Sequence, residues 1–241
     1  MKFGAKDYFE EDFLDFFADK ADFLEVQGLR NHNYDFIKKY KLPIVVHAEH
    51  HKQGSNPCDP NCKTNLVSLQ NSLKIADSVN GKKIILHPGK LNSNGTSINH
   101  SIKFVKKIKD NRILIENMIV NNEIKAPCAD PEEMKMYLEE TSKGLIFDLA
   151  HAMISANYIG ADRIEYIKKF LKLKPMHFHI SGQDLKSLHD EHRALHECDI
   201  DWYEILRMFP KDAEVTMEVS QDVKKTAKDL SMIRNVVRKI A

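Results

Sequence analysis

The feature that most constrains the fold of this chain is a repeated alternation of apolar runs with segments of helical periodicity. Eight short runs, most of them apolar throughout and rich in β-branched residues, predict strands. The expected strands are residues 1–5, 22–28, 43–48, 83–88, 112–117, 144–149, 176–180 and 214–219. Strands of this kind, separated by amphipathic helices, are typical of a parallel sheet that helices cover.

Helical segments follow most of these strands. The expected helices are residues 8–21, 34–40, 65–79, 98–108, 131–141, 164–173, 201–209 and 223–240. The helix 8–21 has an aromatic stripe at Phe9, Phe13, Phe16 and Phe17, which we interpret as core packing. The helix that begins at Pro131 has Asp130 at its N-cap and acids in its first turn.

The number of strand–helix units predicts a single-domain TIM barrel, the (β/α)8 fold, over residues 1–241. We rank this fold ahead of an open doubly wound sheet, because no glycine-rich phosphate motif follows the first strand. The formal charge of +1 neither requires nor excludes a nucleic-acid partner. No apolar run approaches the roughly 20 residues that span a bilayer, and the acidic N-terminus does not resemble a signal peptide. We therefore expect a cytosolic protein without a membrane partner.

Two of the four cysteines, Cys58 and Cys62, lie in the loop sequence NPCDPNCK. A second pair at similar spacing is absent from the sequence, so we favour free thiols or a loop disulfide over a structural zinc clip.

Histidines and acids stand at the ends of most of the expected strands or in the loops that follow them. The candidates are His47, His87, Glu116, Asp148 with His151, His177 or His179, Asp190 with His192, and Glu218. Because the carboxyl ends of barrel strands meet at one face, these side chains are expected to share one mouth. Singly, each residue has an ordinary structural explanation, such as a hydrogen-bonded core histidine. Together they favour a site for two or three divalent metals, because several carboxylates cannot share a dry pocket without cations or protons.

The order of short motifs resembles the endonuclease IV (type 2 AP endonuclease) family of the xylose isomerase-like TIM barrels. The matching segments are HPG at 87–89, IEN at 115–117, FDLAHA at 147–152, HISG at 179–182, DEH at 190–192 and MEV at 217–219. The resemblance covers nearly the whole chain.

The resemblance implies three zinc ions that activate a hydroxide, although manganese or another divalent ion is an alternative. It assigns the first ion to His47, His87 and Glu116. It assigns the second to Glu116, Asp148, His179 and Glu218, and the third to His151, Asp190 and His192. We choose His179 over His177 because a short polar turn follows the corresponding ligand of the family, as Ile180, Ser181 and Gly182 follow His179. As the bridging ligand, Glu116 is the expected catalytic residue.

The implied reaction is hydrolysis of a phosphodiester 5′ to an abasic site during DNA repair, by a monomer that binds such duplex DNA. Three basic loop residues, His50, His51 and Lys52, are among the candidates for a DNA-binding surface. The main alternative is a divalent-metal-dependent sugar or sugar-phosphate isomerase or epimerase of the same superfamily. Such an enzyme needs only Glu116, Asp148, His179 and Glu218 around one metal, with two acids that move a proton. A metal-dependent binding module without enzymatic activity ranks third.

Overall fold

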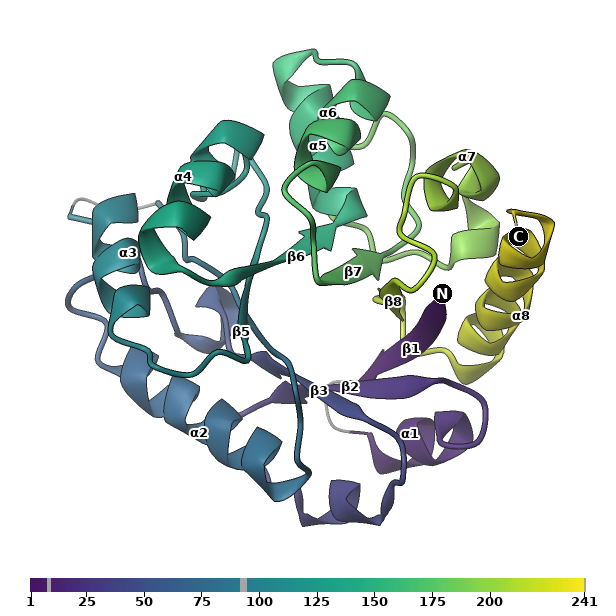
Figure 1. Ribbon diagram of the computed structural model, residues 1–241, viewed down its shortest axis with the longest axis horizontal. Coiled ribbons are helices and arrows are strands. Elements are labelled where there is room, and N and C mark those ends of the chain that lie inside the picture. Colours follow the sequence, from purple (N-terminus) through teal and green to yellow (C-terminus); the bar gives the residue numbers. More distant parts are fainter. Residues whose placement is uncertain (8–9, 92–94, 241) are drawn as a thin grey trace.

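The strands form a closed parallel barrel in the order β1 to β8, and the helices lie outside it (Figure 1). The computed structural model describes residues 1–7, 10–91 and 95–240. The strands are β1 (Lys2–Asp7), β2 (Phe23–Gly28), β3 (Ile44–Ala48), β4 (Ile84–Leu86), β5 (Ile113–Glu116), β6 (Gly144–Asp148), β7 (His177–Ile180) and β8 (Glu214–Met217). β1 pairs in parallel with both β2 and β8, which closes the ring and confirms the predicted TIM barrel.

The described part of the chain has eight α-helices and three short 3-10 helices. The α-helices are α1 (Glu11–Phe17), α2 (Thr64–Ser78), α3 (Ile98–Lys106), α4 (Pro131–Thr141), α5 (Leu149–Ile159), α6 (Arg163–Leu171), α7 (Trp202–Leu206) and α8 (Val223–Ile240). The 3-10 helices are η1 (Asp35–Lys39), η2 (His51–Gln53) and η3 (Leu195–Glu197). No described helix is long and apolar enough to span a bilayer.

The helix predictions hold best where capping signals are strong. α4 begins and ends as predicted, and the Asp130 side chain accepts the backbone N–H groups of Glu132 and Glu133. α8 also has the predicted bounds. The expected helix 34–40 is instead the 3-10 helix η1. The expected helix 8–21 is shorter, and Phe9 of its aromatic stripe lies outside the described residues, whereas Phe13 and Phe17 are buried as predicted.

Helix α5 has no counterpart among the predicted elements. Every residue from Leu149 to Ala156 is buried, so no polar stripe marks a helical period. The helix is covered on one side by the barrel and on the other by neighbouring structure, with α6 beside it (Figure 1). It begins directly after β6, and this places His151 on its first turn.

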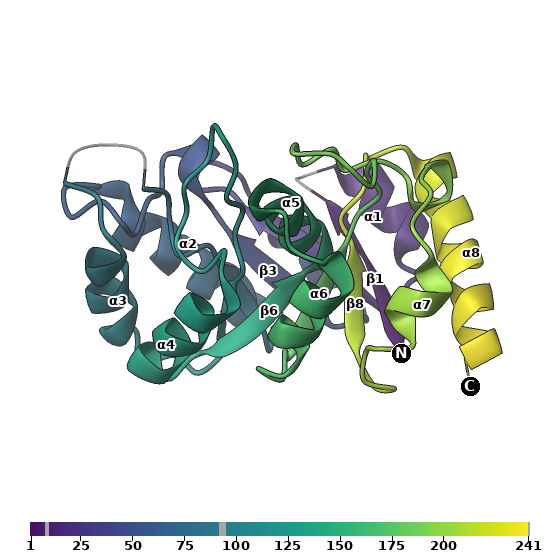
Figure 2. The ribbon, with the colours of Figure 1, turned by 90° about the horizontal axis from the view of Figure 1, so that it is seen from above.

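The barrel interior has an apolar layer toward the N-terminal ends of the strands and a polar layer toward their C-terminal ends, which we call the open end. The apolar layer consists of Phe23, Val45, Ile85, Leu114 and Ile146. A second, larger core lies between the strands and the helices. Figure 2 shows both chain termini on one side of the barrel, opposite to the side on which the strands end. The polar layer therefore faces away from the termini, as the active face of such barrels does.

The cysteines are free thiols, which agrees with one of the two interpretations that we favoured for Cys58 and Cys62. Cys58 is fully buried and its Sγ donates to the carbonyl oxygen of Pro88 at 3.4 Å. This contact holds the β3–α2 loop against the loop that follows β4.

Candidate metal centre

The nine sequence-predicted ligands lie together at the open end of the barrel. Seven of them line one cavity of about 130 Å³, namely His47, His87, Glu116, His151, Asp190, His192 and Glu218. The other two, Asp148 and His179, are buried beside it, with exposed fractions of 1% and 0%. The strand ends therefore bring together donors that are up to 171 residues apart in the sequence, from His47 to Glu218.

The deepest group of donors contains Glu116, Asp148, His179 and Glu218. The Nδ1 atom of His179 lies 2.8 Å from Glu218 Oε2, 3.5 Å from Glu116 Oε1 and 3.9 Å from Asp148 Oδ2. One donor atom from each of the four residues lies within 4.8 Å of the others. All four side chains are buried.

This group fits a divalent metal ion. A tetrahedral ion with bonds of about 2.1 Å separates its ligand atoms by about 3.4 Å, which lies within the range of distances around His179 Nδ1. Although His179 Nδ1 is buried and close to a carboxylate oxygen, it has no hydrogen-bond partner of acceptable geometry in the described structure. Donor atoms that approach one another in this way without a hydrogen bond are consistent with a site for a shared cation.

A second group shares Glu116 with the first. Its Oε2 atom lies 2.8 Å from His87 Nε2 and 3.2 Å from His47 Nε2, whereas Oε1 faces His179. His47 comes from the end of β3 and His87 from the residue after β4. The two oxygens of one carboxylate thus join two donor groups, as a bridging ligand does.

The third predicted group is nearer to the cavity entrance. Asp190 Oδ2 lies 2.7 Å from His192 Nε2 and 3.7 Å from His151 Nε2. His192 has a φ of +47°, a left-handed conformation that is unfavourable for a non-glycine residue. It is held there by a bond between its Nδ1 and the Glu218 carbonyl oxygen at 2.9 Å and by Ser220 N–H, which donates to the His192 carbonyl oxygen.

Most of the candidate histidines are oriented through their second ring nitrogen. His47 Nδ1 contacts the Ala48 carbonyl oxygen at 2.8 Å, and His151 Nδ1 contacts the Asn117 carbonyl oxygen at 2.7 Å. A nitrogen that donates to a carbonyl fixes the tautomer and leaves the other nitrogen free to bind a metal. This pattern of support is typical of metal-binding histidines.

Glu25 and Lys6 are parts of the site that the sequence analysis missed. Glu25 Oε2 lies 3.0 Å from His179 Nε2, on the side of the ring opposite to the donor group. Lys6 Nζ donates to Glu218 Oε1 at 2.6 Å and lies 3.5 Å from Glu25 Oε1, with its side chain 3% exposed. The available signal was an acid in the middle of the strand, two residues after Phe23 and therefore on the same, inward-facing side.

His177 lies deeper in the barrel than His179, as expected. It is fully buried, its ring contacts that of Phe23 in the apolar layer, and its Nε2 bonds to Thr216 Oγ1 at 2.9 Å. Burial lowers the pKa of His177 to about 4, against the opposing effect of Glu25. The ring is therefore a neutral hydrogen-bonding group at neutral pH.

The carboxylates and histidines of the centre change one another's pKa values. Burial lowers the pKa of His179, but Glu25 and Glu218 outweigh burial and hold it well above its usual value. Burial raises the pKa of Asp148 to about 6; the charge of His151 opposes this increase, and the charges of Glu116 and Glu218 add to it. In the absence of metal, protons on these groups thus offset the negative charge that the cluster concentrates.

Comparison with known proteins identifies a family that covers most of the chain. The family described as xylose isomerase-like TIM barrel matches residues 32–236. No curated protein matches the sequence.

Several solved structures share the fold at low sequence identity. A D-tagatose 3-epimerase-like protein has a TM-score of 0.76 at 18% identity, over 100% of this chain and 98% of that one. A 3-keto-D-glucoside 4-epimerase from E. coli has a TM-score of 0.69 at 16% identity, over 98% and 99% of the two chains. Endonuclease IV from Thermus thermophilus has a TM-score of 0.74 at 16% identity, over 99% and 100%. Further similar structures are sugar epimerases. Identities this low establish the fold alone.

Proposed function

We propose that this chain, a metal-dependent enzyme that belongs to the xylose isomerase-like TIM barrel family, hydrolyses phosphodiesters at a multinuclear divalent-metal centre. The observation that carries the proposal is the position of Glu116 between two donor groups. One oxygen faces His47 and His87, and the other faces His179. A centre with a single ion gives His47 and His87 no role, whereas a second ion beside Glu116 uses both.

For this function we propose the three-ion arrangement that the endonuclease IV resemblance implies, which the two donor groups that share Glu116 support. His47, His87 and Glu116 would hold one ion, and Glu116, Asp148, His179 and Glu218 a second. His151, Asp190 and His192 would hold a third. Divalent ions in such a site lower the pKa of water and offset the negative charge of a phosphate.

The chain's own residues position these donors and exclude water around them. Glu25 holds His179 through its Nε2 atom, and Lys6 offsets the charge of Glu218. The Asn117 side chain bonds both backbone groups of Asp148, at 2.6 Å and 3.0 Å, and thereby fixes the end of β6 beside β5. As substrate we propose duplex DNA with abasic sites, acted on by a monomer, as the endonuclease IV resemblance implies.

A metal-dependent sugar epimerase or isomerase is the second candidate. The specific observation in its favour is that Glu116 and Glu218 both approach His179 Nδ1, so that two acids flank one deep donor group. Two such acids can move a proton between the carbons of a sugar. Most of the similar solved structures named above are sugar epimerases, which favours this candidate. The donors outside the group of Glu116, Asp148, His179 and Glu218 favour the hydrolase.

A variant that removes only a donor of the third group, His192→Gln, distinguishes the two functions. We would assay zinc- and manganese-loaded protein with an abasic-site duplex and with a series of ketohexoses, for the wild type, His192→Gln and Glu116→Gln. A hydrolase loses about 100-fold or more in cleavage in both variants, because both remove a donor. An epimerase keeps its activity in His192→Gln and loses it in Glu116→Gln. Epimerisation without any strand cleavage by the fully loaded protein would overturn the proposed hydrolase.

A further inference from the structure

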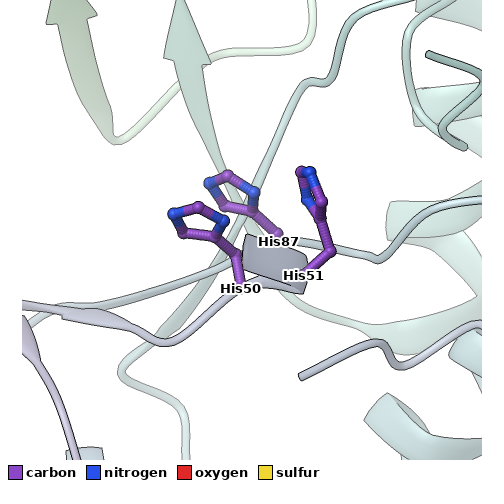
Figure 3. A group of neighbouring side chains, drawn as sticks. All are labelled: His50, His51 and His87. Atoms are coloured by element: carbon purple, nitrogen blue, oxygen red, sulfur yellow. The ribbon is translucent and has the colours of Figure 1, made fainter. Parts of the chain in front are cut away.

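Three histidines form a separate cluster at the rim of the cavity. His50 and His51 lie at the start of η2, and His87 follows β4 (Figure 3). One ring nitrogen from each lies within 4.8 Å of the other two. The His50 ring stacks on the His87 ring, with centroids 4.7 Å apart and an interplanar angle of 16°. His50 and His51 have no part in the donor groups described above.

His87 differs from the other candidate histidines in the contacts of the ring nitrogen that faces away from the centre. The nitrogens of His47, His151, His179 and His192 that face away from the centre contact backbone carbonyls or Glu25. His87 Nε2 faces Glu116, but His87 Nδ1 is buried and has no hydrogen-bond partner in the described part of the chain. A buried polar atom without a partner is unfavourable, so this nitrogen is expected to have a ligand.

The loop that carries His50 and His51 is held in place by several polar contacts. The His50 backbone N–H donates to the Gln53 side chain at 3.1 Å, which forms part of a capping box around η2. Arg30 bonds the Gln53 carbonyl oxygen at 2.8 Å and forms an ion pair with Glu49 at 2.5 Å. The backbone that carries the two imidazoles is therefore held in place before any ligand arrives.

We propose that His50, His51 and the Nδ1 atom of His87 bind a further divalent transition-metal ion, distinct from those of the central donor groups. Imidazole nitrogen suits zinc, copper and nickel, and three imidazoles with one open position form a recurrent type of zinc site. The three side chains also line the cavity, so the open position faces the same space as the central groups.

Binding at this cluster requires little rearrangement. The Lys52 backbone N–H lies 3.4 Å from His50 Nδ1, near the limit for a hydrogen bond, so the loss of this contact costs little. Any proton on His87 Nδ1 leaves to the solvent when the ion binds. If Nε2 of His87 holds a central ion at the same time, the ring is an imidazolate that joins the two sites.

The test is the number of ions that each chain retains. Wild type, the double variant His50→Asn/His51→Asn and the control His32→Asn are saturated with Zn²⁺, freed of excess metal by gel filtration, and analysed by mass spectrometry. His32 is exposed and does not line the cavity. We expect the double variant to retain one ion fewer per chain than the wild type and the control. Equal metal content in all three proteins overturns the proposal, and so does a loss of two or more ions, which would assign these histidines to the central groups.

A spectroscopic readout makes the test independent of metal counting. Cu²⁺ added to the zinc-loaded wild type is expected to exchange into the histidine cluster at the rim of the cavity and show nitrogen hyperfine splitting in its electron paramagnetic resonance spectrum. The splitting should be absent in the double variant and present in His32→Asn. Circular dichroism and thermal melting of the three proteins verify that each is folded, and the same splitting in the double variant would contradict the assignment.

Discussion

The carboxylate of Glu25 lies 3.0 Å from Nε2 of His179, on the side of the ring that faces away from the donor group. Thr216 Oγ1 donates to the same Glu25 oxygen at 2.7 Å, and Lys6 lies 3.5 Å from the other oxygen. Glu25 is fully buried, and although burial raises its pKa, the charges of His179 and Lys6 hold it well below its usual value. The carboxylate is therefore ionised, and it orients the imidazole and increases its basicity.

We predict that Glu25→Gln weakens metal binding without removing a ligand. The amide keeps the size of the side chain but removes the charge that supports His179. Loss of such an outer partner typically reduces metal affinity by about 10–100-fold. Competition with a chromophoric chelator measures this change. Glu140→Gln is the matched control, because Glu140 forms an exposed ion pair with Lys106 on the outside of the barrel. Equal affinity in Glu25→Gln and the control would rule out this role.

Glu25 also illustrates what the sequence could and could not predict. A simple rule predicts the ligands at strand ends, because the carboxyl ends of parallel barrel strands meet at one face and bring these side chains together. Glu25 lies in the middle of β2, and Lys6 meets Glu218 across 212 residues of sequence. Such pairs form between inward-facing side chains that lie at the same height along the barrel axis. This height depends on the register between neighbouring strands, which cannot be inferred from a local sequence pattern.

Helix α5 was missed for a different reason. We identified Asp148 and His151 as a pair at a strand end, but the structure shows that Asp148 caps a helix by accepting the His151 backbone N–H at 2.7 Å. The side chain of Asp148 thus both begins α5 and joins the central donor group. Because α5 is buried along most of its length, its sequence lacks the polar face by which we recognised the other helices.

The turn after His87 gives a prediction about folding and metal binding together. Gly89 has a φ of +117°, and a Cβ atom at this position would lie 2.5 Å from Asn56 Oδ1 and 2.8 Å from the Cys58 backbone nitrogen. We expect Gly89→Ala to lower the free energy of unfolding by about 2–6 kcal/mol, from backbone strain and overpacking, and to weaken metal binding by displacing His87. Denaturant unfolding and chelator competition measure the two effects.

Gly160→Ala is the control for backbone conformation alone. Gly160 ends α5 with a φ of +70°, but an added Cβ would meet no atom within 4 Å. This variant is expected to lose about 1–2 kcal/mol of stability and to keep its metal affinity. If Gly89→Ala and Gly160→Ala behaved alike in both measurements, the packing of Gly89 against the β3–α2 loop would have no part in placing His87.

The pair His192–Asp190 predicts how the metal-free protein responds to pH. Burial lowers the pKa of His192, but its hydrogen bond to Asp190 and the charge of Glu218 raise it overall, from 6.5 to about 9. A raised pKa stabilises the folded state fully below pH 6.5, and this stabilisation is lost as the pH rises through about 9. The loss is at most about 3 kcal/mol. The melting temperature of chelator-treated wild type should therefore fall over this range.

With metal bound, the melting temperature is expected to rise with pH instead of falling. Protons compete with metal ions for histidine nitrogens, so the metal-loaded protein should become more stable as the pH rises over the same range. The melting temperature of metal-free His192→Gln should fall less over this range than that of the metal-free wild type, because the variant lacks the contribution of the His192–Asp190 pair. Thermal melting between pH 6 and pH 9, with and without metal, compares the three samples, and parallel curves for loaded and metal-free wild type would contradict a role of His192 in metal binding.

The choice between the two histidines of β7 leads to the last prediction. His179 Nδ1 faces three carboxylates, whereas His177 is held by Thr216 and by Lys83, whose Nζ lies 3.4 Å from His177 Nδ1. Each substitution by asparagine should cost about 1–3 kcal/mol of stability, because each leaves buried polar partners unsatisfied. His179→Asn should in addition retain fewer ions per chain than the wild type, and His177→Asn the same number. Metal content and unfolding free energy are both measured for each variant. Because stability falls in both variants, only the metal content distinguishes a ligand from a structural side chain. Loss of an ion from His177→Asn, with full retention in His179→Asn, would move the centre one layer deeper into the barrel.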